Sequence, residues 1–126
     1  MIREELRTLA HTFGPLLPAF SRSVTARIFA LREYVKVRDW KSATVTAHLI
    51  CGCSAAYGVH SLARSAEIFA QIARSSRPNT SAIIMELSAL SRMSDEIERL
   101  TAELVENPNG SSSDDQDDLQ LSKGIA

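Results

Sequence analysis

Apolar residues recur three and four positions apart through most of this chain, and this periodicity constrains the fold more than any other feature. No stretch alternates apolar and polar residues between turn dipeptides, as a half-buried strand would. The sequence therefore predicts an all-helical protein. We expect a short first helix, a second from about 15 to 36, a third from about 39 to 57, a fourth after Gly58 and a last from about 80 to 105.

Turn and capping residues mark where these segments end. The pair Gly14 and Pro15 ends the first helix, and Asp39 is a suitable N-cap for the third. Gly58 offers the positive φ that a helix C-terminus needs. Its connection is so short that the third and fourth helices must form a hairpin, in which residues equally far from Gly58 lie level with each other.

Four long helices with one apolar stripe each have one economical packing arrangement. This is an antiparallel four-helix bundle with the stripes turned inward, and the short N-terminal helix would cap one end. We expect the bundle to occupy residues 1–106. Residues 107–126 include the acidic run 111–118, which has almost nothing apolar to bury, so a disordered acidic C-terminal tail is expected.

The composition of the 126 residues argues against several classes of partner. Fourteen Lys and Arg nearly balance fifteen Asp and Glu, giving a net charge of -1, so no field draws the protein to nucleic acid or anionic lipid. No apolar run approaches the roughly 20 residues of a membrane span. The start of the chain lacks the features of a signal peptide, so a cytoplasmic, soluble protein is expected.

His48 lies on the third predicted helix, on the side away from its apolar stripe. An α-helix advances about 100° per residue, so His48 is about 200° from Ile50 and should face water. Its neighbours across the hairpin are expected near residue 68, and Gln71 and Arg74 would stand beside the imidazole. The stripe itself is expected to comprise Ala43, Thr46, Ile50, Cys53 and Tyr57.

Gly52 follows His48 by one helical turn on the same face. A glycine inside a helix costs roughly 1 kcal/mol relative to alanine, which indicates that something must come close to this face. The sequence thus predicts an exposed imidazole on a bare patch, offered to another protein. The other small residues of the patch are Thr44, Cys51 and Ala55.

Few other reactive groups accompany this imidazole. The chain has no glycine-rich phosphate loop, no His-Glu-x-x-His zinc pattern and no nucleophile elbow. His48 and Cys51 lie within one helical turn, but two ligands are too few to hold zinc, so no metal site is expected. A neutral imidazole can still act as a nucleophile near pH 7 if a partner brings the electrophile.

The residues around His48 resemble the histidine-containing phosphotransfer (HPt) domain family, over roughly residues 15 to 105. The resemblance implies a four-helix bundle that accepts a phosphoryl group from the aspartyl phosphate of one receiver domain and passes it to another. It implies a cytoplasmic phosphorelay carrier with no kinase domain, whose partners are response-regulator receiver domains and a hybrid sensor histidine kinase. The matching positions are Ala47, His48, Ile50, Gly52, Ser54, Ala55 and Gly58, then Leu62 and Ala66, with Asp39 and Trp40 as the lead-in.

The same resemblance implies the roles of individual residues. His48 would accept the phosphoryl group, Gly52 would give the receiver room, and no cofactor is expected because the magnesium ion belongs to the receiver. Cys51 departs from the family, because it occupies the position of a lysine that neutralises the phosphoryl charge. Arg74 would take over that duty, Gln71 would be the family's nearby polar residue, and Thr44 and Ala55 would contact the partner.

The departure at Cys51 keeps a second function open. The chain could be a degenerate HPt-like module that docks receiver domains without carrying phosphate. A carrier would lose signalling when His48 is replaced by glutamine, whereas a scaffold would keep it.

Overall fold

The apolar periodicity of the sequence corresponds to helices throughout. A computed structural model describes residues 2–106, and within this range it contains five α-helices, one 3-10 turn and no strand. The all-helical prediction is confirmed, and the expected acidic tail, residues 107–126, lies outside the described residues. The elements are α1 (Ile2–Phe13), η1 (Gly14–Leu16), α2 (Leu17–Lys36), α3 (Trp40–Ala56), α4 (His60–Ala73) and α5 (Thr80–Glu106).

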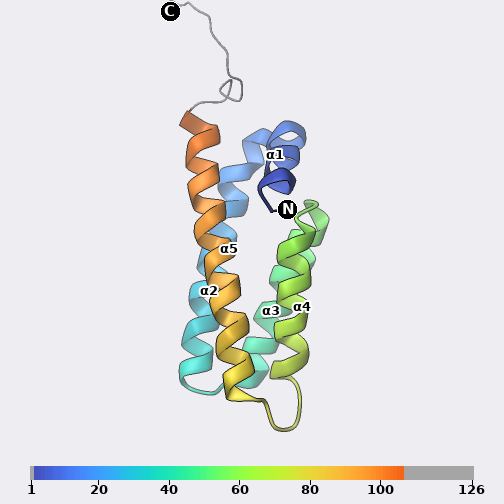
Figure 1. Cartoon of the computed structure of the whole chain (residues 1–126), viewed down its shortest axis with the longest axis vertical. Coiled ribbons are helices and arrows are strands. Elements are labelled where there is room, and N and C mark those ends of the chain that lie inside the picture. Colours follow the sequence, from blue (N-terminus) through green and yellow to red (C-terminus); the bar gives the residue numbers. More distant parts are fainter. Residues whose placement is uncertain (1, 107–126) are drawn as a thin grey trace, which may run out of the picture.

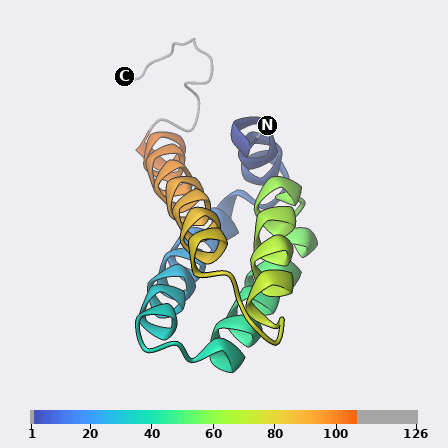
Figure 2. The ribbon, with the colours of Figure 1, turned by 60° about the horizontal axis from the view of Figure 1, so that its bottom comes forward.

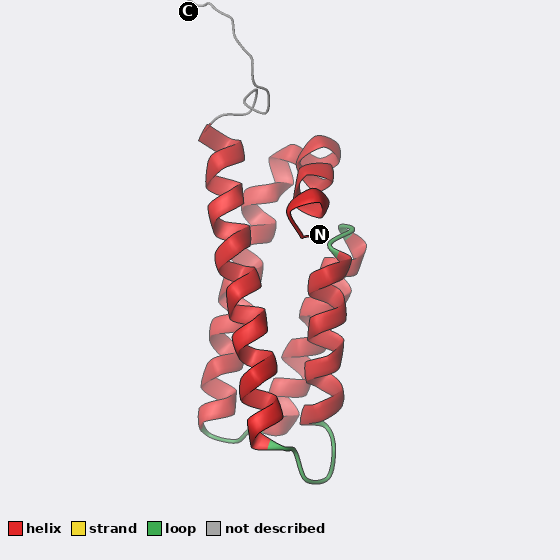
Figure 3. Cartoon of the chain, viewed as in Figure 1, coloured by secondary structure: helices red, strands yellow, loops and turns green. Residues whose placement is uncertain are grey.

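The four long helices lie side by side, and α1 lies at one end of them (Figures 1 and 3). They alternate in direction along the chain, and Figure 2 shows them around a common centre. α2 contacts both α3 and α5, and α4 contacts the same two helices. The order in space therefore follows the order in the chain, with α5 returning to lie beside α2. None of the helices within residues 2–106 is long and apolar enough to cross a membrane.

Each helix turns one apolar stripe toward this common centre. A fully buried aliphatic or aromatic side chain stabilises the fold by about 1.5–3 kcal/mol. Packing of the stripes therefore holds the helices together, and the polar outer faces are not needed for this packing. The large buried side chains of the long helices include Leu17, Ile28, Leu31, Ile50, Leu62, Phe69, Ile83, Leu90 and Ile97.

The start of α2 differs from the sequence prediction. The helix begins at Leu17 rather than near Pro15, because residues Gly14–Leu16 form a 3-10 turn that continues from α1. Pro18 then stands in the first turn of α2, where its missing N–H leaves no hydrogen bond unmade.

The buried face of α3 also differs from the expected stripe. Cys53 and Tyr57 are only partly buried, and the Tyr57 ring meets that of Phe20 edge-on at 5.5 Å between centroids. α3 packs between α2 and α4, so its buried face is broad enough to include Ala47 and Ser54. The buried residues of α3 are Ala43, Thr46, Ala47, Ile50 and Ser54.

Gly58 forms the tight turn between α3 and α4. Its φ is +82°, in the left-handed region that glycine enters without steric cost. The Gly58 N–H donates to the carbonyl of Ala55 at 3.1 Å, and the Val59 N–H donates to that of Ser54 at 2.8 Å. This pair of bonds is a Schellman turn, and it fixes the hairpin register that the sequence predicts.

An equivalent turn ends α2, although no glycine is present. Arg38 has a φ of +58°, and the Asp39 N–H donates to the carbonyl of Tyr34 at 2.9 Å. Asp39 then caps α3, as predicted, because its carboxylate accepts a hydrogen bond from the backbone N–H of Ser42 at 3.1 Å. The side chain of Ser42, then this backbone hydrogen bond, and then the positive charge of Lys41 hold the pKa of Asp39 below its ordinary value.

A carboxylate of α1 caps the beginning of α4. The N-cap residue of α4, Val59, has no side-chain oxygen for the first N–H groups of the helix. Glu5 supplies it from α1, since both of its oxygens accept from the backbone N–H of Ser61, at 3.1 and 3.3 Å. A negative charge at a helix N-terminus is favoured in addition by the helix dipole. α1 is thereby attached to the end of the α3–α4 hairpin.

Candidate functional site

The imidazole of His48 stands on the outer side of α3, near the middle of the helix. Its side chain is 44% exposed, whereas the preceding Ala47 is fully buried. The exposure that the periodicity predicts is therefore found. A side chain fixed at its base by a packed helix, with its ring in solvent, is available to a macromolecular partner.

Glu67 of α4 is the ionisable group next to His48. The distance from His48 Nδ1 to Glu67 Oε1 is 3.8 Å, and the Gln71 side-chain amide donates to Glu67 Oε2 at 3.3 Å. Glu67 is not among the site residues that the sequence predicts. The hairpin register that predicted neighbours near residue 68 was the signal that could have found it.

The position of this carboxylate orients the ring. A distance of 3.8 Å is too long for a hydrogen bond, but it allows a bridging water or direct charge attraction. A carboxylate beside Nδ1 of His48 favours the tautomer that carries its proton there. The lone pair of Nε2 is then left for another group. Gln71 restrains Glu67 in turn, so three side chains from two helices act together.

Cys51, one turn along α3 from His48, cannot supply positive charge to the site. Burial raises the pKa of its thiol, and the neighbouring carboxylate of Glu67 raises it further. The side chain is therefore a neutral thiol near pH 7. Cys51 and Cys53 are both unpaired, and residues 2–106 contain no group of three or more His, Cys, Asp or Glu side chains that could hold a metal ion.

Gly52 leaves open space on the same face as His48. A Cβ added at this glycine would meet no atom within 4 Å, and the residue is exposed. No part of the described chain therefore requires glycine at this position. Its effect is that no side chain projects from the outer surface of α3 there.

Two exposed apolar side chains of α3 lie near His48. Val45 and Leu49 are 53% and 50% exposed, and Arg27 of α2 donates to the backbone carbonyl of Leu49 at 3.4 Å. The predicted bare patch is thus incomplete, because two larger apolar side chains border it. Periodicity places both of them outside the buried stripe, and this was the available signal.

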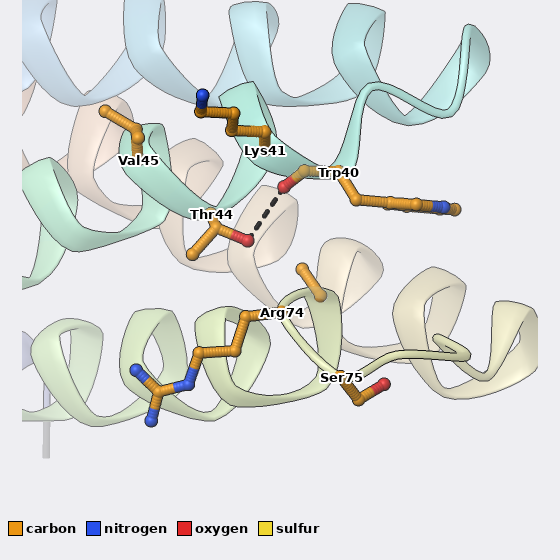
Figure 4. Close-up of a pocket in the computed structure, with 7 residues that line it drawn as sticks. Trp40, Lys41, Thr44, Val45, Arg74 and Ser75 are labelled. Carbon is orange, nitrogen blue, oxygen red and sulfur yellow. Dashed lines mark hydrogen bonds between the residues drawn. The ribbon is translucent and has the colours of Figure 1, made fainter.

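The remaining predicted site residues do not contact the imidazole through hydrogen bonds or ion pairs within residues 2–106. Ala55 is exposed, and Thr44 is partly buried with its hydroxyl donating to the carbonyl of Trp40 at 2.7 Å. Among residues 2–106, neither Gln71 nor Arg74 forms a hydrogen bond or ion pair with His48. Gln71 acts through Glu67, and Arg74 lines a separate pocket at the next turn (Figure 4).

Comparisons with known proteins add no assignment. No protein-family model, no curated protein and no solved structure matches the chain.

Proposed function

We propose that the protein is a histidine phosphotransfer protein of a two-component phosphorelay, with α2 to α5 as the antiparallel four-helix bundle of an HPt domain. The observation that carries this proposal is the half-exposed imidazole of His48, which stands midway along a packed helix beside the open surface of Gly52. A carrier needs one accessible nucleophile and room for the donor. It needs no pocket of its own, because the donor brings the remaining groups.

The transfer step follows from the orientation of the ring. Nε2 of His48 attacks the phosphorus of a receiver's aspartyl phosphate, a P–N bond forms, the P–O bond breaks and the receiver aspartate leaves as a carboxylate. The imidazole keeps its proton on Nδ1 and becomes cationic. Glu67, 3.8 Å from Nδ1, stabilises that charge. The reverse step returns the phosphoryl group to the aspartate of a second receiver.

The proposed docking surface is centred on α3. Val45 and Leu49 would give the receiver an apolar contact near His48, and Gly52 would let its backbone approach one turn further along α3. Response-regulator receivers are the proposed partners, with a hybrid sensor histidine kinase as the first donor in the cytoplasm. The magnesium ion of the reaction would be held by the receiver.

A second function is favoured by the charges around the imidazole. The neutral thiol of Cys51 replaces a cation, and Glu67 places a carboxylate beside the ring. Both features disfavour a phosphoryl dianion at His48. The alternative is a binding module that docks receivers without carrying phosphate.

Transfer of label separates the two functions. Receiver domains carrying radiolabelled aspartyl phosphate are mixed with the wild type, with His48→Gln and with His60→Gln, whose imidazole is exposed at the start of α4. A carrier gains acid-labile, base-stable label in the wild type and in His60→Gln only. Receiver binding without any label would establish the binding module instead.

A further inference from the structure

A pocket of about 340 Å³ opens between α3 and α4, one helical turn from His48. Thr44 and Val45, which line it, precede His48 by four and three residues, so the pocket lies about 5.4 Å along the helix from the imidazole. Any partner that covers His48 also covers this turn, because specific interfaces bury about 800 Å² per partner. The lining residues are Trp40, Lys41, Thr44, Val45, Ala73, Arg74 and Ser75.

Two positive side chains flank the pocket, one from each helix. Lys41 lines the pocket from α3 and Arg74 from α4; in Figure 4 the guanidinium of Arg74 extends along α4, and the Lys41 side chain extends from α3 on the side away from α4. Neither side chain forms an ion pair with a carboxylate among residues 2–106. The carboxylate that Lys41 influences is that of Asp39, which already accepts a hydrogen bond at the start of α3.

The wall between these two cations is largely apolar. Trp40, Val45 and Ala73 contribute carbon surface, and the hydroxyl of Thr44 is already engaged with the Trp40 carbonyl. A small inorganic anion would leave that carbon surface exposed. A side chain with a methylene stem and a terminal carboxylate would cover the carbon surface and meet the guanidinium of Arg74, with Lys41 adding positive charge at the α3 edge of the pocket.

We propose that this pocket receives an acidic side chain of the protein that docks over His48. The identity of the partner as a receiver domain rests on the proposed function. The pocket itself is argued from charge complementarity and from its place beside the imidazole. Its role is to fix the orientation in which the partner docks. Complementary charges at an interface contribute more to such specificity than to affinity.

The acidic run of the chain itself is the competing occupant. It follows the end of α5 opposite to the pocket, since the pocket lies beside the α4–α5 connection (Figure 1). The 27 residues of α5 span about 40 Å. Asp114 is eight residues beyond Glu106, a reach of at most about 29 Å, and Asp118 is twelve residues beyond it, a reach of at most about 43 Å. Only the last aspartates of the run could span this length, and only with the chain fully extended, so an external carboxylate is favoured.

The test measures receiver binding and phosphotransfer separately, using the receiver domain that donates fastest to the wild type. We expect K41A/R74A to raise KM for the receiver about 3- to 10-fold and to weaken binding equally. The loss should shrink at high ionic strength. The control R22A/R32A removes the same charge from exposed positions on α2 outside the pocket, and it should leave both quantities near the wild-type values.

The possible results separate the pocket proposal from the carrier function. Equal KM for K41A/R74A and wild type would remove it while leaving the carrier function intact. Binding that still depends on Lys41 and Arg74, without transfer of label, would refute the carrier function alone. A lower KM when the four aspartates of 114–118 are changed to asparagine in the full chain would assign the pocket to the tail. Saturable binding of inorganic phosphate to the protein alone, abolished by K41A/R74A, would assign it to a free anion.

Discussion

Replacing Gly52 by alanine should make the protein more stable. The residue is inside α3, so alanine gains the helix propensity that glycine lacks, about 1 kcal/mol. The added Cβ meets no atom within 4 Å, so no clash reduces this gain. For a domain of this size the expected rise in melting temperature is about 4 °C. Thermal and urea denaturation of both proteins measure it directly.

The same position should show a conflict between stability and docking. Gly52→Gln keeps much of the helix gain, because glutamine also favours helix over glycine. Its side chain would stand where the receiver approaches, and overpacking a contact costs about 1–3 kcal/mol, so KM should rise about 5- to 150-fold. Ala102→Gln is the matched control, since it adds the same side chain at an exposed position of α5, which does not contact α3.

Two results would refute this reasoning about Gly52. A melting temperature of Gly52→Ala equal to or below that of the wild type would mean that the helix is strained or contacted there. Normal transfer to Gly52→Gln would mean that the partner does not need the open surface, and the glycine would then be unexplained.

Three further predictions concern charge and backbone. Glu67→Gln should lower the pKa of the Cys51 thiol, but not to its ordinary value, because burial is the larger cause of the shift. Alkylation of Cys51, measured in a Cys53→Ser background, should therefore become faster near pH 8. An unchanged alkylation rate would contradict the contact between Glu67 and Cys51. Arg38→Gly should stabilise the protein by about 1 kcal/mol, because glycine adopts a positive φ without strain. Chemical denaturation would measure the gain. A loss of stability would show that the contacts of the arginine side chain outweigh the backbone strain. Asp39→Ala should lower the melting temperature at pH 7. Because the folded pKa of Asp39 is depressed, the difference in melting temperature between the variant and the wild type should vanish as the pH falls below 3.8. A difference that stays constant with pH would refute the cap.

Much of the fold is predictable because it depends on local rules. Apolar periodicity identifies every long helix, and the residue types at Asp39 and Gly58 identify the cap and the hairpin turn. The turn at Arg38 is different, since arginine carries no preference for positive φ and only the surrounding helices impose it. The broad buried face of α3 likewise depends on packing against two neighbours, which periodicity on one helix cannot express.

The candidate site is predictable in part for the same reason. Exposure of His48 follows from its angle to Ile50, and the hairpin brings α4 beside it at the expected level. Which residue of α4 meets the ring depends on rotation of that helix about its axis. That rotation places Glu67 beside the imidazole and Arg74 in the neighbouring pocket, and no residue pattern in α4 encodes it.

The position of the phosphoryl group after transfer tests the central claim most directly. The full-length protein is incubated with a phosphorylated receiver, and mass spectrometry with phosphorus NMR locates the phosphate and the nitrogen that carries it. We predict a P–N bond to Nε2 of His48 in the wild type. A phosphoryl group on another residue, or none on His48 while a receiver remains bound, would contradict it.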